Sequence, residues 1–268
     1  MTRVLSTIGR AISYGLVALL STAPRASAQR VETGFLDRTV VHGTLSYPYE
    51  VFVPAGYASD KAWPVILFLH GAGERGSDGL LQTTVGLGPA IRRDPARFPA
   101  LIVMPQLPKD SQWVGAPAEA ALEALRRTMA EFRVDSNRIY LTGMSMGGHG
   151  SWYLAFRHRE LFAAVAPICG WVTERPESPG SVPVVPPDSG PPLPTLARRL
   201  HRMPLWIVHG EMDQVVPVAA SREAAAALRA AGGNVRYTEL LGMDHDAWDA
   251  AYASRAFVAW LLAQHRGH

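Results

Sequence analysis

The most informative segment of the chain is Gly143-Met144-Ser145-Met146-Gly147-Gly148. It follows the apolar run 139–142, which predicts a buried strand, and it opens a segment that predicts a helix. A serine on a sharp turn between strand and helix needs glycines at its flanks, because side chains there would collide. Such a turn lifts the Ser145 hydroxyl above the sheet edge and aims the Met146 N–H at a developing oxyanion. The pattern predicts a nucleophilic serine; the alternative is a tight turn that only packs a helix against a strand.

A nucleophilic serine needs a base, and a histidine follows the predicted strand 235–241. His245 stands in Gly-Met-Asp-His-Asp-Ala-Trp, residues 242–248. This loop comes at the carboxyl end of a strand, where ligands bind in open parallel sheets. The flanking Asp244 and Asp246 have a second interpretation, as a helix N-cap or as salt-bridge partners. We predict that His245 is the general base.

An acid must fix the tautomer of that base and stabilise its protonated form. Asp213 ends the motif His-Gly-Glu-Met-Asp, which follows the predicted strand 205–208. Glu211 is the alternative acid, but Asp213 lies further beyond the strand and just before Val-Val-Pro. We therefore predict Asp213 as the acid and interpret His209 as a core histidine.

A second oxyanion donor is expected in the glycine-rich loop His-Gly-Ala-Gly-Glu-Arg-Gly, residues 70–76. Its glycines allow the backbone to approach a substrate closely. No Gly-Lys-Ser/Thr follows, which disfavours a phosphate-binding loop. The N–H of Ala72 is the predicted donor, together with that of Met146, and His70, Glu74 and Arg75 are interpreted as supports of the loop.

Short apolar runs alternate with Ala-rich amphipathic segments along the chain. Continuous apolar runs are typical of strands buried on both faces. The alternation predicts an α/β fold with a mostly parallel central sheet and helices on both faces, edged by antiparallel strands from 35–53. The predicted strands are 51–53, 65–69, 101–104, 139–142, 163–168 and 205–208, and the predicted helices are 117–132, 219–231 and 246–264.

One stretch interrupts this alternation. Eight prolines fall between Pro176 and Pro194, inside a predicted insertion at 172–198. Proline fixes φ and lacks an N–H, so the stretch is predicted to be neither helix nor central strand. We interpret it as a surface loop, and a flap over the active site is the alternative.

The first 28 residues are typical of a secretory signal peptide. Arg3 and Arg10 are basic, residues 11–20 are apolar, and Ala26-Ser27-Ala28 is a small-x-small cleavage site. A membrane anchor is the alternative, but the apolar run is shorter than the roughly 20 residues that a span needs. We expect a secreted or periplasmic protein with a single domain at 29–268 and no membrane segment after cleavage.

The composition is that of a globular protein, with 48% hydrophobic and 18% charged residues. The net charge of +3 comes from Arg3, Arg10 and Arg25, since the remaining 23 basic and 23 acidic residues balance. No nucleic acid partner is therefore indicated.

The sequence gives little reason to expect a metal or other cofactor. Cys169 is the only cysteine, which excludes an internal disulfide and a cysteine-cluster metal site, and we interpret it as a buried thiol. The histidines outside the motifs have no metal-ligand spacing. Trp113 and Trp171 fall near predicted sheet ends and are candidates to line a pocket for an aryl or sugar group; filling the core margin is the alternative.

Four motifs together resemble the α/β-hydrolase superfamily: residues 69–76, 143–152, 209–217 and 245–248. Within it, the chain is similar to secreted carboxylesterases of the feruloyl esterase and polyhydroxybutyrate depolymerase-like group, and to the "predicted peptidase" and phospholipase/carboxylesterase families. The resemblance extends from about Tyr47 to the C-terminus. It implies Ser145 as nucleophile, Asp213 as acid, His245 as base, and Ala72 and Met146 as oxyanion hole.

We therefore expect a serine esterase that acts on short-chain acyl or aryl/feruloyl esters, either small or polymer-linked. A serine peptidase on the same fold is an alternative, but an amide needs better protonation of its leaving group and no gating domain is evident. A non-catalytic binding protein is a second alternative; it would be expected to lack a member of the triad, and all three are present. The sequence does not define the oligomeric state.

Overall fold

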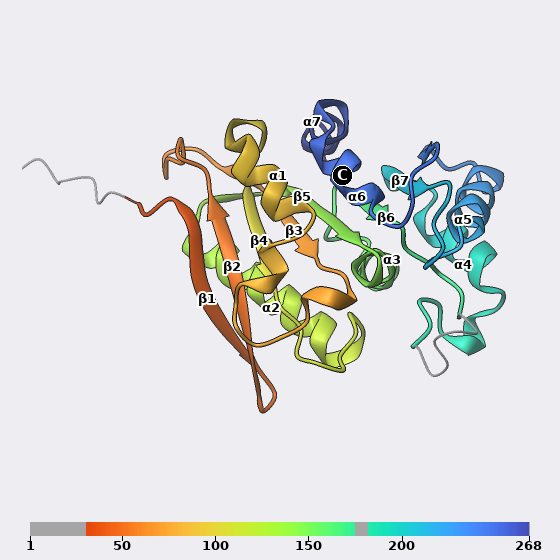
Figure 1. The fold of residues 1–268 in the computed structure, drawn as a ribbon, viewed down its shortest axis with the longest axis horizontal. Helices are drawn as coiled ribbons and strands as arrows, with labels where there is room; N and C mark the ends of the chain where they lie inside the picture. The colour runs from red at the N-terminus through yellow and green to blue at the C-terminus, as the bar shows by residue number, and fades with distance from the viewer. Residues whose placement is uncertain (1–30, 175–181, 268) are drawn as a thin grey trace, which may run out of the picture. The chain divides into compact units, whose positions relative to one another are not determined.

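A twisted sheet of eight strands runs through the described residues, 31–174 and 182–267 of the computed structural model. The strands are β1 (Gly34–His42), β2 (Leu45–Val53), β3 (Trp63–Leu69), β4 (Leu101–Pro105), β5 (Val134–Met144), β6 (Ala164–Ile168), β7 (Leu205–Gly210) and β8 (Val235–Leu240). Their order is β1-β2-β4-β3-β5-β6-β7-β8 (Figure 1). The six strands from β4 to β8 are parallel, whereas β1 pairs with β2 and β2 with β4 in antiparallel fashion. This confirms the predicted fold class and the antiparallel edge.

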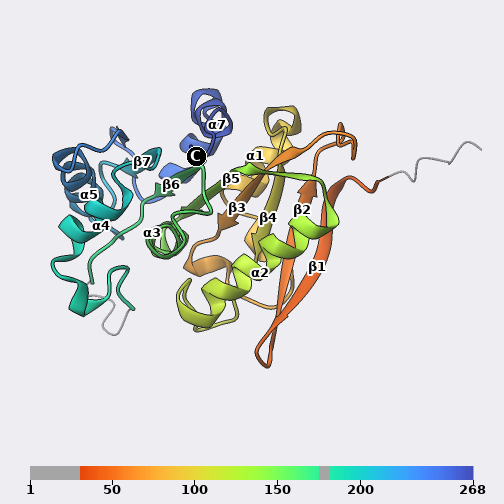
Figure 2. The same ribbon diagram turned by 180° about the vertical axis from the view of Figure 1, so that it is seen from behind.

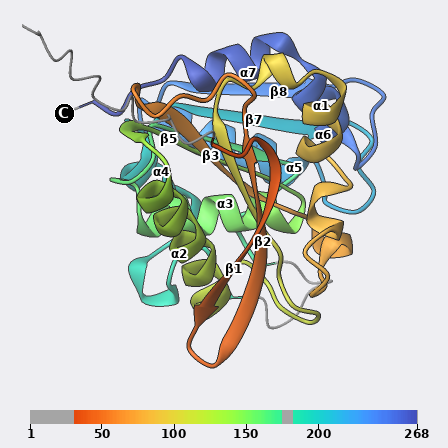
Figure 3. The same ribbon diagram turned by 90° about the vertical axis from the view of Figure 1, so that its left-hand side faces the viewer.

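Helices cover both faces of the sheet. They are α1 (Leu87–Arg93), α2 (Gly115–Glu131), α3 (Met146–Arg157), α4 (Pro192–Leu200), α5 (Ala219–Ala230), α6 (Ala247–Ala253) and α7 (Arg255–Leu262). The helices α1, α6 and α7 share one apolar cluster, and α2, α3, α4 and α5 share the other. Figure 3 shows α1, α6 and α7 above the sheet with α2 and α3 below it, and Figure 2 shows α2 lying across β1 and β2.

The central strands are apolar on both faces because each face meets a layer of helices. Every residue of β3 is buried. Successive side chains of a strand point to opposite faces, so Val65 and Leu67 pack into one cluster while Ile66 and Phe68 pack into the other. The continuous apolar run in the sequence is therefore a consequence of burial on both sides.

Two predictions about helices need correction. The predicted last helix, 246–264, is two helices, since α6 ends at Ala253 and Ser254 caps α7 by accepting a hydrogen bond from the N–H of Phe257 at 3.3 Å. The proline-rich stretch was predicted to contain no helix, yet α4 begins at Pro192. Proline is tolerated in the first turn of a helix because the N–H it lacks has no partner there. Residues 175–181 of that stretch, and the predicted signal peptide, lie outside the described residues.

The parallel strands bring four loops to the same edge of the sheet. Three of them follow β3, β7 and β8, and the fourth connection is the turn by which β5 runs directly into α3 (Figure 1). Carboxyl ends of parallel strands lie at one edge, which is where open α/β sheets bind ligands. No described helix is long and apolar enough to cross a bilayer.

A buried acid lies in the antiparallel part of the sheet. Glu50 of β2 is 4% exposed, and its Oε2 has no hydrogen-bond partner among the described residues. Burial, together with the carboxyl group of Asp37 opposite it on β1, raises the pKa of Glu50 to about 7, although Arg92 opposes the shift. The folded protein therefore binds a proton at Glu50 more tightly than the unfolded chain does.

We predict that Glu50→Gln stabilises the protein at alkaline pH. A folded-state pKa above the unfolded value of 4.5 means that stability is present at low pH and is lost as pH rises toward about 7. The variant cannot ionise, so at about pH 8 it should be more stable than the parent by on the order of 2 kcal/mol, and nearly equal to it at about pH 4. Urea unfolding at both pH values measures the difference. Glu223→Gln, an exposed glutamate on α5, is the matched control; an equal gain in both variants would contradict the prediction.

Candidate active site

The turn between β5 and α3 has the strained backbone that the sequence predicts. Ser145 is the N-cap residue of α3 and has φ 55° and ψ −118°. A positive φ is rare for residues other than glycine and costs about 1–3 kcal/mol. The strain is held in place by a hydrogen bond from the N–H of Ser145 to the carbonyl of Ile168 at 2.9 Å and by one from the N–H of His149 to the carbonyl of Ser145 at 3.0 Å.

Two glycines of the turn are fixed by contacts between backbones. A Cβ on Gly147 would lie 1.9 Å from the carbonyl oxygen of Leu69, the last residue of β3. A Cβ on Gly143 would lie 2.3 Å from the carbonyl oxygen of Gly147. Neither position can hold a side chain unless α3 moves away from the sheet.

A chain of hydrogen bonds joins the ends of three strands. The Nε2 of His245 lies 2.9 Å from the Oγ of Ser145, and its Nδ1 lies 2.7 Å from the Oδ2 of Asp213. Ser145 follows β5, Asp213 follows β7 and His245 follows β8. The sequence separates them by up to 100 residues, and the sheet brings them together. Because Asp213 is an acceptor, Nδ1 carries the proton and Nε2 is free to accept one from Ser145.

The carboxyl group of Asp213 is buried and fully hydrogen-bonded. Its Oδ1 accepts hydrogen bonds from the N–H of Val215 at 2.9 Å and of Val216 at 2.8 Å. Burial raises its pKa, but the hydrogen bonds from His209, from His245 and from Val216 outweigh this and hold the pKa below its ordinary value. Asp213 is therefore an anion over the whole neutral range, as a partner for an imidazolium must be.

The alternative acids of the sequence have other partners. Glu211 accepts a hydrogen bond from the N–H of Gly242 at 2.9 Å. Asp244 accepts from the N–H of Gln214 at 3.2 Å and of His245 at 2.8 Å, and so braces the histidine loop. Asp246 is the N-cap residue of α6, although its side chain makes no capping hydrogen bond. Of these described acids, Asp213 is the one whose carboxylate is hydrogen-bonded to the imidazole of His245.

The predicted oxyanion loop lies beside the serine. Ala72 begins the 3₁₀ helix η1 (Ala72–Glu74), and Gly71 precedes it. A Cβ on Gly71 would lie 3.6 Å from the Cβ of Ser145. The first N–H groups of a helix lack intrahelical partners, which applies to Ala72 at the start of η1 and to Met146 at the start of α3. Both N–H groups therefore lie at positions that lack an intrahelical partner, one beside Ser145 along the chain and one on the loop next to it.

A buried histidine holds this loop in shape. His70 accepts a hydrogen bond at Nε2 from the N–H of Leu107 at 3.0 Å and donates from Nδ1 to the carbonyl of Gly71 at 2.6 Å. Burial lowers the pKa of His70 to about 4, so the ring is neutral at neutral pH. Arg75 donates from Nε to the carbonyl of Ala72 at 2.9 Å. Both residues support the loop, as the sequence analysis inferred.

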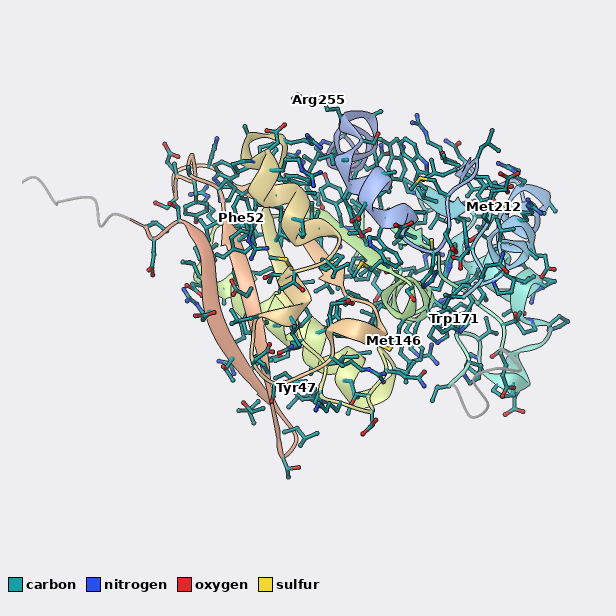
Figure 4. All side chains as sticks on the ribbon, in the orientation of Figure 1. Tyr47, Phe52, Met146, Trp171, Met212 and Arg255 are labelled. Carbon is teal, nitrogen blue, oxygen red and sulfur yellow. The ribbon has the colours of Figure 1, made fainter. Side chains whose placement is uncertain are left out.

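The prediction that Trp113 lines a pocket is wrong. Its side chain is 0% exposed and cannot reach a substrate. Its indole N–H donates to the carbonyl of His70 at 2.9 Å, so it supports the oxyanion loop from inside the core. Trp171 is 6% exposed and its ring stacks on that of His149, with centroids 4.7 Å apart. Figure 4 labels Trp171 near Met146, the first residue of α3. The role of Trp171 in binding stays a prediction.

One aromatic contact at the site was not anticipated. The ring of Trp248 meets that of His245 edge to face, with centroids 5.0 Å apart. Its position three residues after His245, at the start of α6, was the signal for a contact of this kind.

A cavity of about 570 Å³ opens beside the oxyanion loop. It lies between the loops that follow β3 and β4, and its lining includes Arg75, Leu81, Pro108 and Lys109. A larger cavity of about 630 Å³ lies at the opposite edge, before β6 and β7. The first cavity shares Arg75 and Gly76 with the glycine-rich loop, whereas the second includes no residue of that loop. Neither lining includes Ser145, Asp213 or His245, so cavity size alone does not locate the site.

Cys169, His209 and Asp213 are the one group of described residues whose ligand atoms could hold a metal ion, all within 4.8 Å of one another. Burial raises the pKa of the Cys169 thiol to about 12, so the thiol is protonated, whereas a metal needs the thiolate. His209 and Asp213 already use these atoms in hydrogen bonds. The donor set fits a hydrogen-bond network better than a metal ion.

The sheet, its two helical layers and the Ser145 turn define an α/β-hydrolase. The chain belongs to the family described as "Putative esterase", whose model matches residues 46–228. No match was found among curated proteins.

Solved structures with similar folds are hydrolases. A thermostable esterase is 33% identical with a TM-score of 0.74; the match covers 87% of this chain and 63% of the esterase chain. A ferulic acid esterase of Anaeromyces mucronatus, in complex with ferulic acid, is 18% identical with a TM-score of 0.61, covering 88% and 93%. A fluorophosphonate-binding serine hydrolase of Staphylococcus aureus is 16% identical with a TM-score of 0.65, covering 85% and 99%. The last two likenesses show the fold.

We predict that Gly147→Ala destabilises the protein by about 3 kcal/mol or more, because the added Cβ would meet the backbone of Leu69 at 1.9 Å. Urea unfolding measures the loss. Gly56→Ala is the matched control, since a Cβ there meets nothing within 4 Å. Equal stability of the two variants would contradict the close contact between α3 and β3.

Proposed function

We propose that this protein is a serine hydrolase that cleaves carboxylic esters through a covalent acyl-enzyme. The observation that carries the proposal is the hydrogen-bonded chain from Ser145 to His245, at 2.9 Å, and from His245 to Asp213, at 2.7 Å. Membership of the esterase family supports the reaction type. We assign Ser145 as nucleophile, His245 as general base and Asp213 as the acid that orients it.

In the first step, Ser145 attacks the carbonyl carbon of the ester. Its Oγ forms the new C–O bond as its proton passes to the Nε2 of His245. The imidazolium formed is stabilised by the carboxylate of Asp213, which stays ionised. The geometry suits this transfer, since donor and acceptor already lie at hydrogen-bond distance.

The carbonyl oxygen becomes an anion as the tetrahedral intermediate forms. We assign the N–H groups of Ala72 and Met146 to bind it. Each opens a helical turn, so no reorganisation is needed when the charge develops. Removing one oxyanion donor from such a site typically costs about 10²–10³ in rate.

Collapse of the intermediate breaks the ester bond, and His245 returns its proton to the leaving alcohol. Water then enters the site and gives a proton to His245 while its oxygen attacks the acyl carbon. The second intermediate collapses, the acid leaves, and the proton returns from His245 to Ser145. The cycle consumes one water for each ester and restores the enzyme.

Short-chain acyl or aryl esters, including feruloyl esters, are the substrates that we propose. The cavity beside the oxyanion loop has apolar lining from Leu81 and Pro108 and charged lining from Arg75, Lys109 and Asp78. It shares Arg75 with the loop that carries Ala72, so it is our candidate place for one part of an ester. The similarity in fold to a structure titled as a ferulic acid esterase is consistent with an aryl acyl group. The basic and apolar pattern of residues 1–28 supports export to the periplasm or cell exterior as a further part of the proposal.

We predict that Ser145→Ala abolishes ester hydrolysis, with at least about a thousandfold loss of kcat/KM, because the nucleophile is gone. Serine and alanine both carry a Cβ, so the backbone strain at residue 145 is the same in the two proteins. The variant should therefore keep the parent's fold and its unfolding temperature within a few degrees. Hydrolysis of p-nitrophenyl esters from acetyl to palmitoyl, of methyl ferulate and of a peptide anilide measures the effect.

Ser151→Ala is the matched control, since the Oγ of Ser151 donates within α3 to the carbonyl of Gly147 and plays no part in the proposed chemistry. Serine-dependent turnover that peaks on short acyl or feruloyl esters is the expected result. Hydrolysis of the peptide anilide and of no ester would contradict the esterase proposal and support a peptidase activity. Unchanged ester turnover in a pure, folded Ser145→Ala protein would overturn the proposal.

A further inference from the structure

Asp213 contacts two histidines through the same oxygen. Its Oδ2 lies 2.7 Å from the Nδ1 of His245 and 3.1 Å from the Nε2 of His209. The mechanism proposed above uses only the first contact. The second histidine is the penultimate residue of β7, four residues before Asp213, and belongs to no step of the reaction.

The orientation of His209 is fixed on both sides of its ring. Its Nε2 lies 2.9 Å from the carbonyl oxygen of Val216, and its Nδ1 lies 2.7 Å from the Oγ of Ser221. The carbonyl and the carboxylate beside Nε2 can only accept, so Nε2 carries a proton whether the ring is neutral or charged. That N–H is directed at Val216 and at Asp213 together. The ring also joins β7 to α5, which contains Ser221.

The contact is buried among the described residues. His209 is 0% exposed and Ser221 is 1% exposed, and the side chain of Asp213 is fully buried in the same place. A hydrogen bond to a charged group is stronger in a buried site than in water, because the surrounding dielectric is low. The N–H of His209 therefore withdraws negative charge from the Oδ2 that faces His245, and it fixes the direction of that oxygen.

We propose that His209 is a positioning residue, which orients Asp213 and lowers the proton affinity of His245 by sharing the carboxylate charge. The inference rests on the proposed function, because it assigns His245 as the base. A carboxylate that interacts with His245 alone would hold the imidazolium more tightly. The base would then lose its neutral form at a higher pH, so His209 extends activity toward the acid side.

The other titratable groups around the pair are Cys169 just after β6, Glu211 after β7, Glu239 on β8, and Asp244 and Asp246 beside His245. Glu74 on η1 lies near Gly71, on the side of Ser145. Burial raises the pKa values of Cys169 and Glu74. The substitutions below change none of these groups, so a shift in the pH profile reports on His209.

The test compares three variants on a neutral p-nitrophenyl ester. His209→Leu combined with Ser221→Ala removes the donor to Asp213 and the hydroxyl that it would leave unpaired. Ser221→Ala alone is the matched control. His209→Gln restores a side-chain N–H near the position of Nε2. The readout is the midpoint of the acid limb of kcat/KM against pH, with the folded fraction measured at each pH.

The midpoint should rise by about 0.5–1 pH unit in the double variant, stay at the parental value in Ser221→Ala, and return most of the way in His209→Gln. A double variant whose activity falls at every pH by the same factor, with the midpoint unmoved, would reduce His209 to a structural role and overturn the proposal.

A second measurement needs neither a substrate nor a folded double variant. In protein labelled with ¹⁵N at histidine, the Nε2–H signal of His209 should shift with the same midpoint as the ring of His245, because both share Oδ2. His209→Gln and His245→Gln spectra assign the two signals. A His209 signal that stays still while His245 titrates would overturn the coupling. If the two signals shift together but the protein hydrolyses no ester, the coupling of His209 to His245 stands and the proposed esterase function fails.

Discussion

The close approach of α3 to the end of β3 is the constraint on which the whole site depends. Gly147 lies so near the carbonyl of Leu69 that a Cβ there would be 1.9 Å from its oxygen. To begin α3 at that distance, the chain must reverse at Ser145, which takes a φ of 55°. Because β3 and β5 are neighbours in the sheet, the same approach brings Ser145 against Gly71 and the loop that carries Ala72. One backbone contact therefore positions both the serine hydroxyl and the N–H groups on either side of it.

The other side chains of the site are held in fixed orientations because they are buried and hydrogen-bonded. The side chain of His245 is 18% exposed, whereas the side chain of Asp213 is fully buried. Around Asp213 the donors are backbone N–H groups and rings held by their own hydrogen bonds, so none of them must move as charge develops. The supports of the oxyanion loop follow the same rule, since Trp113 and His70 are both fully buried. The exposed surface of the site is small, and most of its order comes from side chains that no substrate touches.

Much of this could be predicted from local sequence. Apolar runs such as 65–69 predict strands buried on both faces, and the glycines around Ser145 predict the strained turn. What local sequence cannot give is the environment of a side chain. Trp113 near a sheet end was as consistent with a pocket as with a core, and only packing decided for the core. The start of α4 at Pro192 and the helix break at Ser254 depend on which backbone N–H groups find partners. The sequence pattern predicts Asp213 as the partner of His245, but it contains no sign that His209 contacts the same carboxylate.

The central claim is that Ser145 is a nucleophile activated by His245. Labelling with a fluorophosphonate tests it most directly, because the serine oxygen bonds to phosphorus, fluoride leaves, and the stable adduct can be located by peptide mass spectrometry. We expect one adduct, on the peptide that contains Ser145, formed rapidly by the parent and slowed by at least about a hundredfold in His245→Ala. An adduct on another residue, or equal rates with and without His245, would contradict it.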